Sequence, residues 1–230
     1  MIKDQRPVPL GISSSNIHAD IARFSTARLK VALQRDGRLT EISRQILSKE
    51  LGIEEIPLPR HPRIVVSSTD DGEVGFHYAK TSALCGLIAD FSAHLAVVGN
   101  YQIIEGNYKD KVRAITSYGE SWLWPLVIAT SSERQIKSIE QVRRIATRYP
   151  VMTRHFFDSI GMAGVEIIFS EGGVEVMPYT LHNGWNVDAV VDLVSTGETL
   201  STYGLVQWDP PISYVYPVLI GDIGFRRPIR

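Results

Sequence analysis

The chain has 230 residues, of which 44% are hydrophobic, so it can form one large domain or two small lobes around a core. A formal net charge of −1 excludes a broad basic surface for nucleic acid, and no apolar run approaches the roughly 20 residues that span a bilayer. The sequence contains a single cysteine, Cys85, and no signal-peptide core, so we expect a cytoplasmic protein without an intramolecular disulfide.

The first half of the sequence predicts an extension followed by strands and helices. Residues 1–28 include a short amphipathic piece, Ile17–Phe24, and we expect this extension to pack on the first lobe or on a partner subunit. The elements expected after it are a strand at Leu29–Leu33, a helix at Thr40–Leu51, a strand at Arg63–Ser68, a helix at Ala79–Phe91, and strands at Leu95–Val98 and Val112–Tyr118.

The second half continues the alternation with shorter elements. These are a strand at Leu126–Thr130, a short helix at Ser138–Val142, a strand at Arg144–Thr147, a helix at Thr153–Ile160 closed by Gly161, and strands at Val165–Phe169 and Val187–Val194. Such alternation predicts mostly parallel sheets covered by helices. We expect a first lobe over residues 29–122, to which residues 212–230 return, and a second lobe over residues 123–211.

The segment from Asp188 to Leu200 carries the strongest functional signal. Its apolar residues predict a buried strand that ends in the sequence Ser195-Thr196-Gly197-Glu198-Thr199, where a helix can begin. The backbone N–H groups of such a turn, together with a helix N-terminus, can bind a phosphate monoester. A carboxylate at the strand, Asp192 or Asp188, could bind ribose hydroxyls, so the segment predicts a 5-phosphoribosyl pocket. The same pattern is also typical of a simple helix cap.

Residues Asp192–Leu200 resemble the phosphoribosyl-diphosphate loop of the ATP phosphoribosyltransferase family, Asp-Leu/Ile-Val-Ser/Glu-Thr-Gly-x-Thr-Leu, and Tyr203-Gly204-Leu205 stands where that family has Asn-Gly-Leu. Other segments resemble the family's motifs in the same order along the chain. They are Leu29–Leu33 with Gly37-Arg38-Leu39, Arg144–Pro150, Thr153–Phe157 and Gly173–Pro178.

The chain departs from the family pattern in the expected first lobe. Where the family has Ala-Asp-Leu-Gly-Ile-Thr-Gly followed by an acidic residue and Asp, this chain has Ala93–Tyr101. The residues that replace the family's Asp, Gly, Thr and acidic positions are His94, Ala96, Val98, Asn100 and Tyr101, and Asp36 replaces the Lys of the Lys-Gly-Arg-Leu turn. The donor half of the pattern is intact, so the departures concern the acceptor.

The resemblance implies a two-lobed α/β fold with mostly parallel, helix-covered sheets and a central cleft, like that of type II periplasmic binding proteins. It implies a glycosyltransferase that moves the 5-phosphoribosyl group from phosphoribosyl diphosphate to N1 of ATP and releases diphosphate, the first step of histidine biosynthesis. It further implies Mg²⁺ carried mainly by the diphosphate, a short catalytic-only form, a homodimer and a separate regulatory subunit similar to a histidyl-tRNA synthetase.

Two other functions stay open on the sequence alone. One is a related phosphoribosyltransferase whose acceptor is another nucleotide or nitrogen heterocycle, because the altered residues lie in the acceptor half. The other is a non-catalytic two-lobed binding or regulatory protein. A carboxylate placed before Thr-Gly-x-Thr favours a transferase, since a pure binding module has no need of it.

The candidate site residues follow from the resemblance. Asp192 would orient the ribose hydroxyls, with Asp188 as the alternative, and Glu175 would lie near the ribose. Arg38 is the candidate cation for diphosphate or acceptor phosphates. The 5′-phosphate would be held by backbone N–H groups and threonine hydroxyls of Ser195, Thr196, Gly197, Glu198 and Thr199. Arg38 as a surface arginine and Glu175 as a helix first-turn acid remain alternatives, and the histidines show no metal-ligand spacing.

Overall fold

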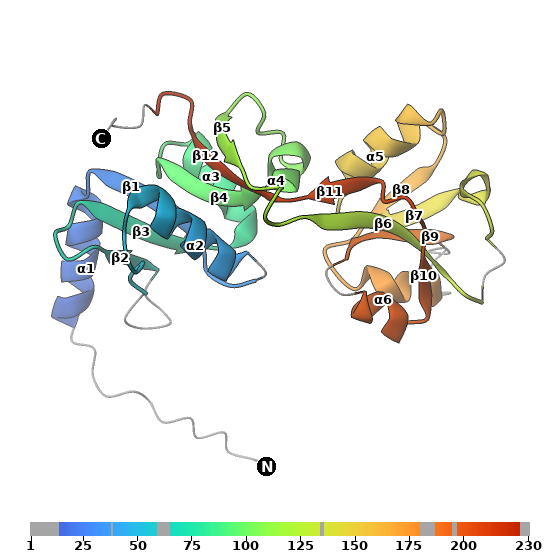
Figure 1. Ribbon diagram of the computed structural model, residues 1–230, viewed down its shortest axis with the longest axis horizontal. Coiled ribbons are helices and arrows are strands. Elements are labelled where there is room, and N and C mark those ends of the chain that lie inside the picture. Colours follow the sequence, from blue (N-terminus) through green and yellow to red (C-terminus); the bar gives the residue numbers. More distant parts are fainter. Residues whose placement is uncertain are drawn as a thin grey trace, which may run out of the picture. The chain divides into compact units, whose positions relative to one another are not determined.

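A computed structural model of the protein describes residues 14–37, 39–58, 65–133, 136–179, 187–194 and 197–225. Contacts divide it into two compact units, one reaching to Val97 and taking in the residues from Gly224, the other running from Val98 to Ile223. Each unit contains strands and helices, which are labelled in Figure 1. The expected lobe boundary at residue 122 stays a prediction.

The first unit is built around strand β1 (Leu29–Gln34), whose last four residues are all buried. It pairs in parallel with β3 (Val74–Ala79) and with β4 (Leu95–Gly99), and β2 (Val66–Ser68) pairs antiparallel with β3. Its helices are α1 (Ser14–Thr26), α2 (Thr40–Leu51), the short 3₁₀ turn η1 (Thr81–Ala83) and α3 (Leu84–Ala89).

Helix α1 belongs to the expected N-terminal extension and packs against β2 and β3. The ring of Phe24 meets the edge of the His77 imidazole at 6.0 Å between centroids. Burial lowers the pKa of His77 from its ordinary value.

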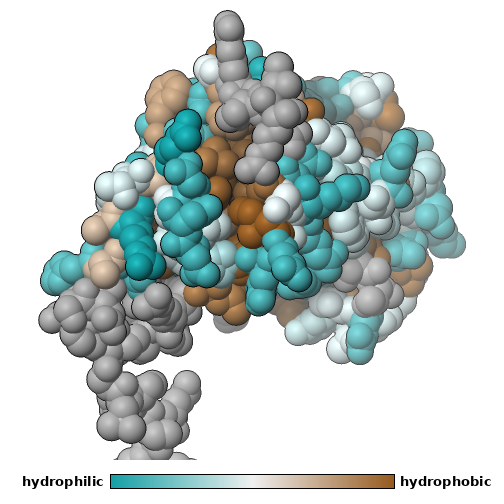
Figure 2. All heavy atoms as spheres, turned by 60° about the vertical axis from the view of Figure 1, so that its left-hand side comes forward, coloured by the Kyte–Doolittle hydropathy of each residue, from teal (hydrophilic) through white to brown (hydrophobic). Residues whose placement is uncertain are grey.

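Figure 2 shows an apolar strip, in brown, bordered by hydrophilic side chains. Exposed apolar side chains described in this unit are Ile21, Leu58, Val65 and Phe91.

The second unit begins with helix α4 (Asn100–Glu105) and strand β5 (Val112–Ser117). Its further elements are β6 (Trp124–Ser131), η2 (Ile139–Gln141), β7 (Arg144–Thr147), α5 (Pro150–Ser159), β8 (Glu166–Phe169), η3 (Val174–Tyr179), β9 (Ala189–Leu193), α6 (Glu198–Thr202), β10 (Leu205–Gln207), β11 (Ser213–Val215) and β12 (Pro217–Asp222).

The described strands form two six-stranded sheets. One has the order β2-β3-β1-β4-β12-β5, and the other has the order β10-β6-β9-β7-β8 with β11 also paired to β6. In the second sheet β7 is parallel to β8 and β9, whereas β6 is antiparallel to β9, β10 and β11. The expected α/β class with two sheets is confirmed, and antiparallel strands flank the parallel pairs.

Two hydrophobic clusters cover the two faces of the second sheet. Side chains of β9 alternate between them, because successive residues of a strand point to opposite faces. Ala189 and Val191 pack with Phe157 of α5, whereas Val190 packs with Met177 of η3 and with Leu200 and Leu205. Helix α5 thus covers one face, and η3 and α6 cover the other.

The structure differs from the expected elements at two neighbouring places. The helix expected over Ala79–Phe91 is wrong in its first part, since Ala79 ends strand β3 and only Leu84–Ala89 is α-helical. Phe91 has a φ of 62°, which a right-handed helix cannot contain. Strand β3 was not among the expected elements, although Val74, Phe76 and Tyr78 alternate with Gly75 and His77 as in a strand. No helix among the described residues is long and apolar enough to cross a membrane.

Candidate functional site

The predicted phosphate turn follows strand β9 at the edge where three parallel strands end. Register pairs Thr147 of β7 with Val191 of β9 and with Phe169 of β8. The loops that follow these strands therefore leave the sheet side by side. Ligand sites of open α/β sheets commonly lie outside such carboxyl ends.

Asp192 stands near the end of β9, directly before the predicted turn. It pairs with Val127 of β6 and is half-buried, and its Oδ1 accepts the N–H of Leu193 at 2.8 Å. Asp192 lies two residues after Val190 in β9, so the two side chains point to the same face of the sheet. The side chain of Val190 packs with η3 and α6. The carboxylate therefore belongs to the face that η3 and α6 cover.

Gly197 begins helix α6 in a left-handed conformation, with a φ of 77°. Residues with a Cβ rarely adopt this conformation, so the turn favours glycine whatever space surrounds it. The first i to i+4 bond of α6 runs from the Ser201 N–H to the Gly197 carbonyl at 3.0 Å. N–H groups in the first turn of a helix have no acceptor within the helix. Because α6 has only five residues, its dipole is small. The N–H groups of its first turn would therefore contribute more to phosphate binding than the helix dipole.

Glu198 and Thr199 are both exposed in the first turn of α6. The carbonyl of Glu198 accepts the hydroxyl groups of Ser201 and Thr202 at 2.9 and 2.8 Å. The expected loop residues Ser195 and Thr196, and the expected cation Arg38, lie outside the described residues. The role of each of these positions stays a prediction.

Asp188 lies at the opposite end of β9 from the turn. Its Oδ2 accepts two backbone N–H groups, from Arg143 at 2.8 Å and from Arg144 at 3.0 Å. Arg144 in turn binds Glu166 at 2.6 Å, and this hydrogen bond, with the charge of Glu166, raises the pKa of the guanidinium. Asp188 thus joins the starts of β7 and β9, so of the two carboxylates the geometry favours Asp192 for the site.

Glu175 is half-buried in the first turn of η3, between two core residues of that helix. Its neighbours Val174 and Met177 belong to the cluster that contains Leu200 of α6. The end of η3 is joined to the residue after α6, because the Tyr179 hydroxyl donates to the Tyr203 carbonyl at 2.5 Å. The structure therefore places η3 and α6 over the same face of the sheet that contains β9.

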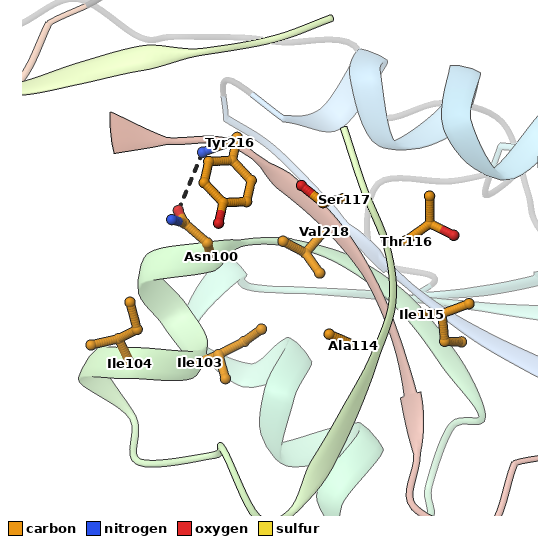
Figure 3. A pocket seen from close by; sticks show the side chains of 9 residues that line it. All are labelled: Asn100, Ile103, Ile104, Ala114, Ile115, Thr116, Ser117, Tyr216 and Val218. Carbon is orange, nitrogen blue, oxygen red and sulfur yellow. Dashed lines mark hydrogen bonds between the residues drawn. The ribbon is translucent and has the colours of Figure 1, made fainter. Parts of the chain in front are cut away.

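A hollow of about 300 Å³ lies elsewhere in the second unit, between α4 and strands β5 and β12. Figure 3 shows the residues that line it, none of which was predicted to bind the donor: Asn100, Ile103, Ile104, Ala114, Ile115, Thr116, Ser117, Tyr216 and Val218. Most of its lining is apolar, so it provides no set of charged groups for a phosphorylated ligand.

Asn100, one of the altered family positions, binds the segment between β11 and β12. Its Nδ2 donates to the Tyr214 carbonyl at 3.0 Å. Its Oδ1 accepts the Tyr216 N–H at 3.2 Å, the bond drawn in Figure 3. The Asn100 N–H also donates to the Tyr216 carbonyl at 3.0 Å. An aspartate could not donate the side-chain bond to Tyr214. Sequence reasoning missed this role, because the partners lie more than 100 residues away.

The other altered polar positions also make internal contacts. Tyr101 packs edge-on against Tyr149 with 5.2 Å between ring centroids. The His94 Nδ1 accepts the Lys30 N–H at 2.9 Å, and the His94 N–H donates to the Lys30 carbonyl at 2.8 Å. His94 extends the pairing with β1, and Tyr101 packs against the residue that precedes α5. Both residues thus have a structural role that does not depend on an acceptor.

Glu105 at the end of α4 caps helix α5. Its Oε2 accepts the Val151 N–H and its Oε1 accepts the Met152 N–H, both at 2.9 Å. A carboxylate at this position complements the helix dipole and two unsatisfied donors. The N-terminus of α5 is therefore already occupied by an anionic group of the chain.

The described part of the chain contains no group of three or more His, Cys, Asp and Glu side chains arranged to hold a metal ion. The acidic residues of the candidate site that the structure describes are Asp192, Glu175 and Glu198, with Asp188 at the far end of β9. Mg²⁺ usually keeps several waters and takes one or two carboxylates together with substrate phosphates. This residue set thus fits a metal that arrives with a phosphorylated substrate.

The model of the family HisG, ATP phosphoribosyltransferase, matches residues 80–223, which is more than half of the chain. The chain belongs to the ATP phosphoribosyltransferase family. It is 28% identical over 185 residues to the ATP phosphoribosyltransferase of Methanocaldococcus jannaschii, with 79% of this chain and 61% of that protein covered. It is 30% identical to that of Ruminiclostridium cellulolyticum, with 79% and 81% covered. The chain thus spans less than two thirds of some family members and most of others.

Solved structures agree with this family fold. One chain of the ATP phosphoribosyl transferase (HisG:HisZ) complex from Thermotoga maritima has a TM-score of 0.62 at 22% identity, with 84% of this chain and 87% of that chain covered. A probable amino-acid ABC transporter extracellular-binding protein, ytmK from Bacillus subtilis, has a TM-score of 0.51 at 15% identity, with 85% and 84% covered. At these identities the likeness shows the fold alone, and it confirms the expected similarity to periplasmic binding proteins.

Proposed function

We propose that this protein transfers the 5-phosphoribosyl group from phosphoribosyl diphosphate to N1 of ATP and releases diphosphate. The observation that carries the proposal is a family match across residues 80–223 that includes an intact Asp192–Leu200 loop. The glycine of this loop has the left-handed conformation that a close backbone approach to phosphate favours. We further propose that the reaction serves histidine biosynthesis and takes place in the cytoplasm.

In the reaction, the bond from C1 of the ribose to the diphosphate oxygen breaks while the adenine nitrogen bonds to C1. The transition state carries oxocarbenium character, so the protein acts mainly by positioning and by electrostatic stabilisation. Asp192 would accept hydrogen bonds from the ribose hydroxyls, and Glu175 would lie beside the ribose on the same face of the sheet. Backbone N–H groups around Gly197 and the hydroxyl of Thr199 would hold the 5′-phosphate.

Mg²⁺ would be bound chiefly by the donor's diphosphate and would neutralise its charge as it leaves. We also propose that the protein forms a homodimer and associates with a regulatory subunit; the association is supported by the shared fold with a chain of the Thermotoga maritima HisG:HisZ complex. Size-exclusion chromatography with light scattering measures directly whether the protein is a homodimer.

The contacts of Asn100 and Tyr101 favour a second candidate, a transferase with the same donor and another nitrogen-heterocycle acceptor. Both residues replace family acids and make contacts inside the protein. An acceptor that the family binds through those acids would lose these contacts here. A different acceptor would leave the predicted donor residues unchanged.

Diphosphate release tests both candidates. The purified protein is incubated with phosphoribosyl diphosphate, Mg²⁺ and one acceptor at a time, ATP first. We expect release with ATP, and Asp192→Asn should lower turnover while leaving the melting temperature nearly unchanged. Asp188→Ala is the control, because it removes the oxygen that accepts two N–H groups and should lower the free energy of unfolding by about 1–3 kcal/mol with little direct effect on turnover. Release with none of the acceptors would contradict the proposal.

A further inference from the structure

The geometry points to Arg148 as a further substrate-binding residue, which contacts the diphosphate of the donor. This inference rests on the proposed function and extends it to a residue in the loop between β7 and α5. In the sequence Arg148 occupies the variable position of the Thr-x-Tyr-Pro motif, so the motif itself does not assign it a role.

Strand register places Arg148 next to Asp192. The last pair of β7 and β9 is Thr147 with Val191, so the residues one step further are Arg148 and Asp192. Neighbouring strands lie about 4.8 Å apart, which is less than the length of an extended arginine side chain. Arg148 lies two residues after Ala146, and alternate residues of a strand point to the same face. The side chain of Ala146 packs in the cluster that contains residues of η3 and α6.

The start of the loop is fixed in place on both sides of Arg148. The Thr147 carbonyl accepts the Ser170 N–H at 3.0 Å, and the Thr147 Oγ1 accepts the Tyr149 N–H at 2.9 Å. Tyr149 is buried, and Pro150 begins helix α5. The backbone position of Arg148 is therefore determined by its neighbours, whereas its side chain is exposed.

Nearby arginines are bound to groups of the protein itself. Arg143 donates to the Glu140 carbonyl at 2.6 Å, Arg144 pairs with Glu166, and Arg154 donates to the Ala163 carbonyl at 2.8 Å. Among the residues described by the structure, Arg148 forms no side-chain hydrogen bond or ion pair. Its guanidinium is thus available for a ligand at the carboxyl edge of the sheet.

Charge indicates which ligand group Arg148 meets. The α5 N-terminus cannot bind an incoming anion without displacing Glu105. In the proposed site the Gly197 turn holds the 5′-phosphate and Asp192 holds the ribose, so the diphosphate at C1 is the group that a further cation can meet, beside Mg²⁺ and the expected Arg38. The planar guanidinium can bind two diphosphate oxygens at once.

Calorimetric titration of wild type and Arg148→Gln with three probes tests this inference. The probes are phosphoribosyl diphosphate and inorganic diphosphate, each with Mg²⁺, and ribose 5-phosphate, which lacks the diphosphate. We expect the substitution to raise the dissociation constants for the first two about tenfold or more and to leave that for ribose 5-phosphate unchanged. Arg148→Lys should restore part of the affinity, because it keeps the charge and loses the bidentate contact.

Arg113→Gln is the matched control, because Arg113 is an exposed arginine on β5 in the other sheet. It should bind all three probes like wild type. Equal donor affinity in wild type and Arg148→Gln would overturn the inference. Failure of wild type to bind the donor would instead overturn the proposed function, and the inference with it.

Discussion

Gly197 is the single residue on which the donor turn most directly depends. We predict that Gly197→Val abolishes donor binding, because its φ of 77° is costly for a β-branched residue and the backbone would move away from the phosphate. Calorimetry with phosphoribosyl diphosphate measures the loss of binding. Thermal unfolding should show a loss of about 1–2 kcal/mol.

Gly161 offers a matched control for that substitution. It has the same φ of 77° after helix α5; a Cβ there would meet no atom within 4 Å, and one at Gly197 would meet only the Val194 Cγ1 at an ordinary 3.9 Å. Gly161→Val should therefore lose a similar free energy of unfolding and keep its donor affinity. Equal binding by both variants would show that the turn after β9 does not hold the phosphate.

Residue patterns alone could predict Gly197 and Asp192 but could not choose between Asp192 and Asp188. Both aspartates flank the same apolar run, and each could end the strand that bears the ligand. The choice came from tertiary hydrogen bonds, since Asp188 accepts two N–H groups from residues that are more than 40 positions away. Local spacing contains no information about such a partner.

Among the elements, helix α4 most clearly differs from what the family pattern predicts. Its first residue, Asn100, binds Tyr214 and Tyr216, and its last residue, Glu105, caps α5. Both contacts lie within the second unit. Helix α4 therefore connects the segment between β11 and β12 with the start of α5, whereas the sequence indicated only that its first residues depart from the family pattern.

We predict that Asn100→Asp, which introduces an acidic residue of the family type, lowers the free energy of unfolding by about 1–3 kcal/mol. The variant would place a carboxylate oxygen against the Tyr214 carbonyl in place of a donor. Asn107→Asp serves as the control, because Asn107 is exposed and Asp tolerates its φ of 54°. Urea unfolding compares the two, and an equal midpoint for both would contradict the assigned role of Asn100.

For the molecule as a whole, Cys85 reports on the integrity of the first unit. It is 1% exposed, and burial raises the pKa of its thiol to about 12. At pH 8 its thiolate would then be roughly one part in ten thousand, and only the thiolate reacts with a disulfide reagent. We predict that labelling is slow in the native protein and accelerates as denaturant unfolds it. Rapid labelling without denaturant would contradict this burial.

The sequence by itself determined the family, the α/β class and the turn that ends β9, because these depend on local periodicity and on motifs in a fixed order. Strand β3 was not predicted although Val74, Phe76 and Tyr78 alternate with Gly75 and His77, and the 3₁₀ turn beyond it resembles the start of a helix. The tertiary structure alone shows that η3 and α6 cover the same face, that Asp188 joins two strands, and that Thr147 and Val191, the residues before Arg148 and Asp192, are paired. These relations depend on strand register and on contacts between distant residues, which hydrophobic periodicity does not specify.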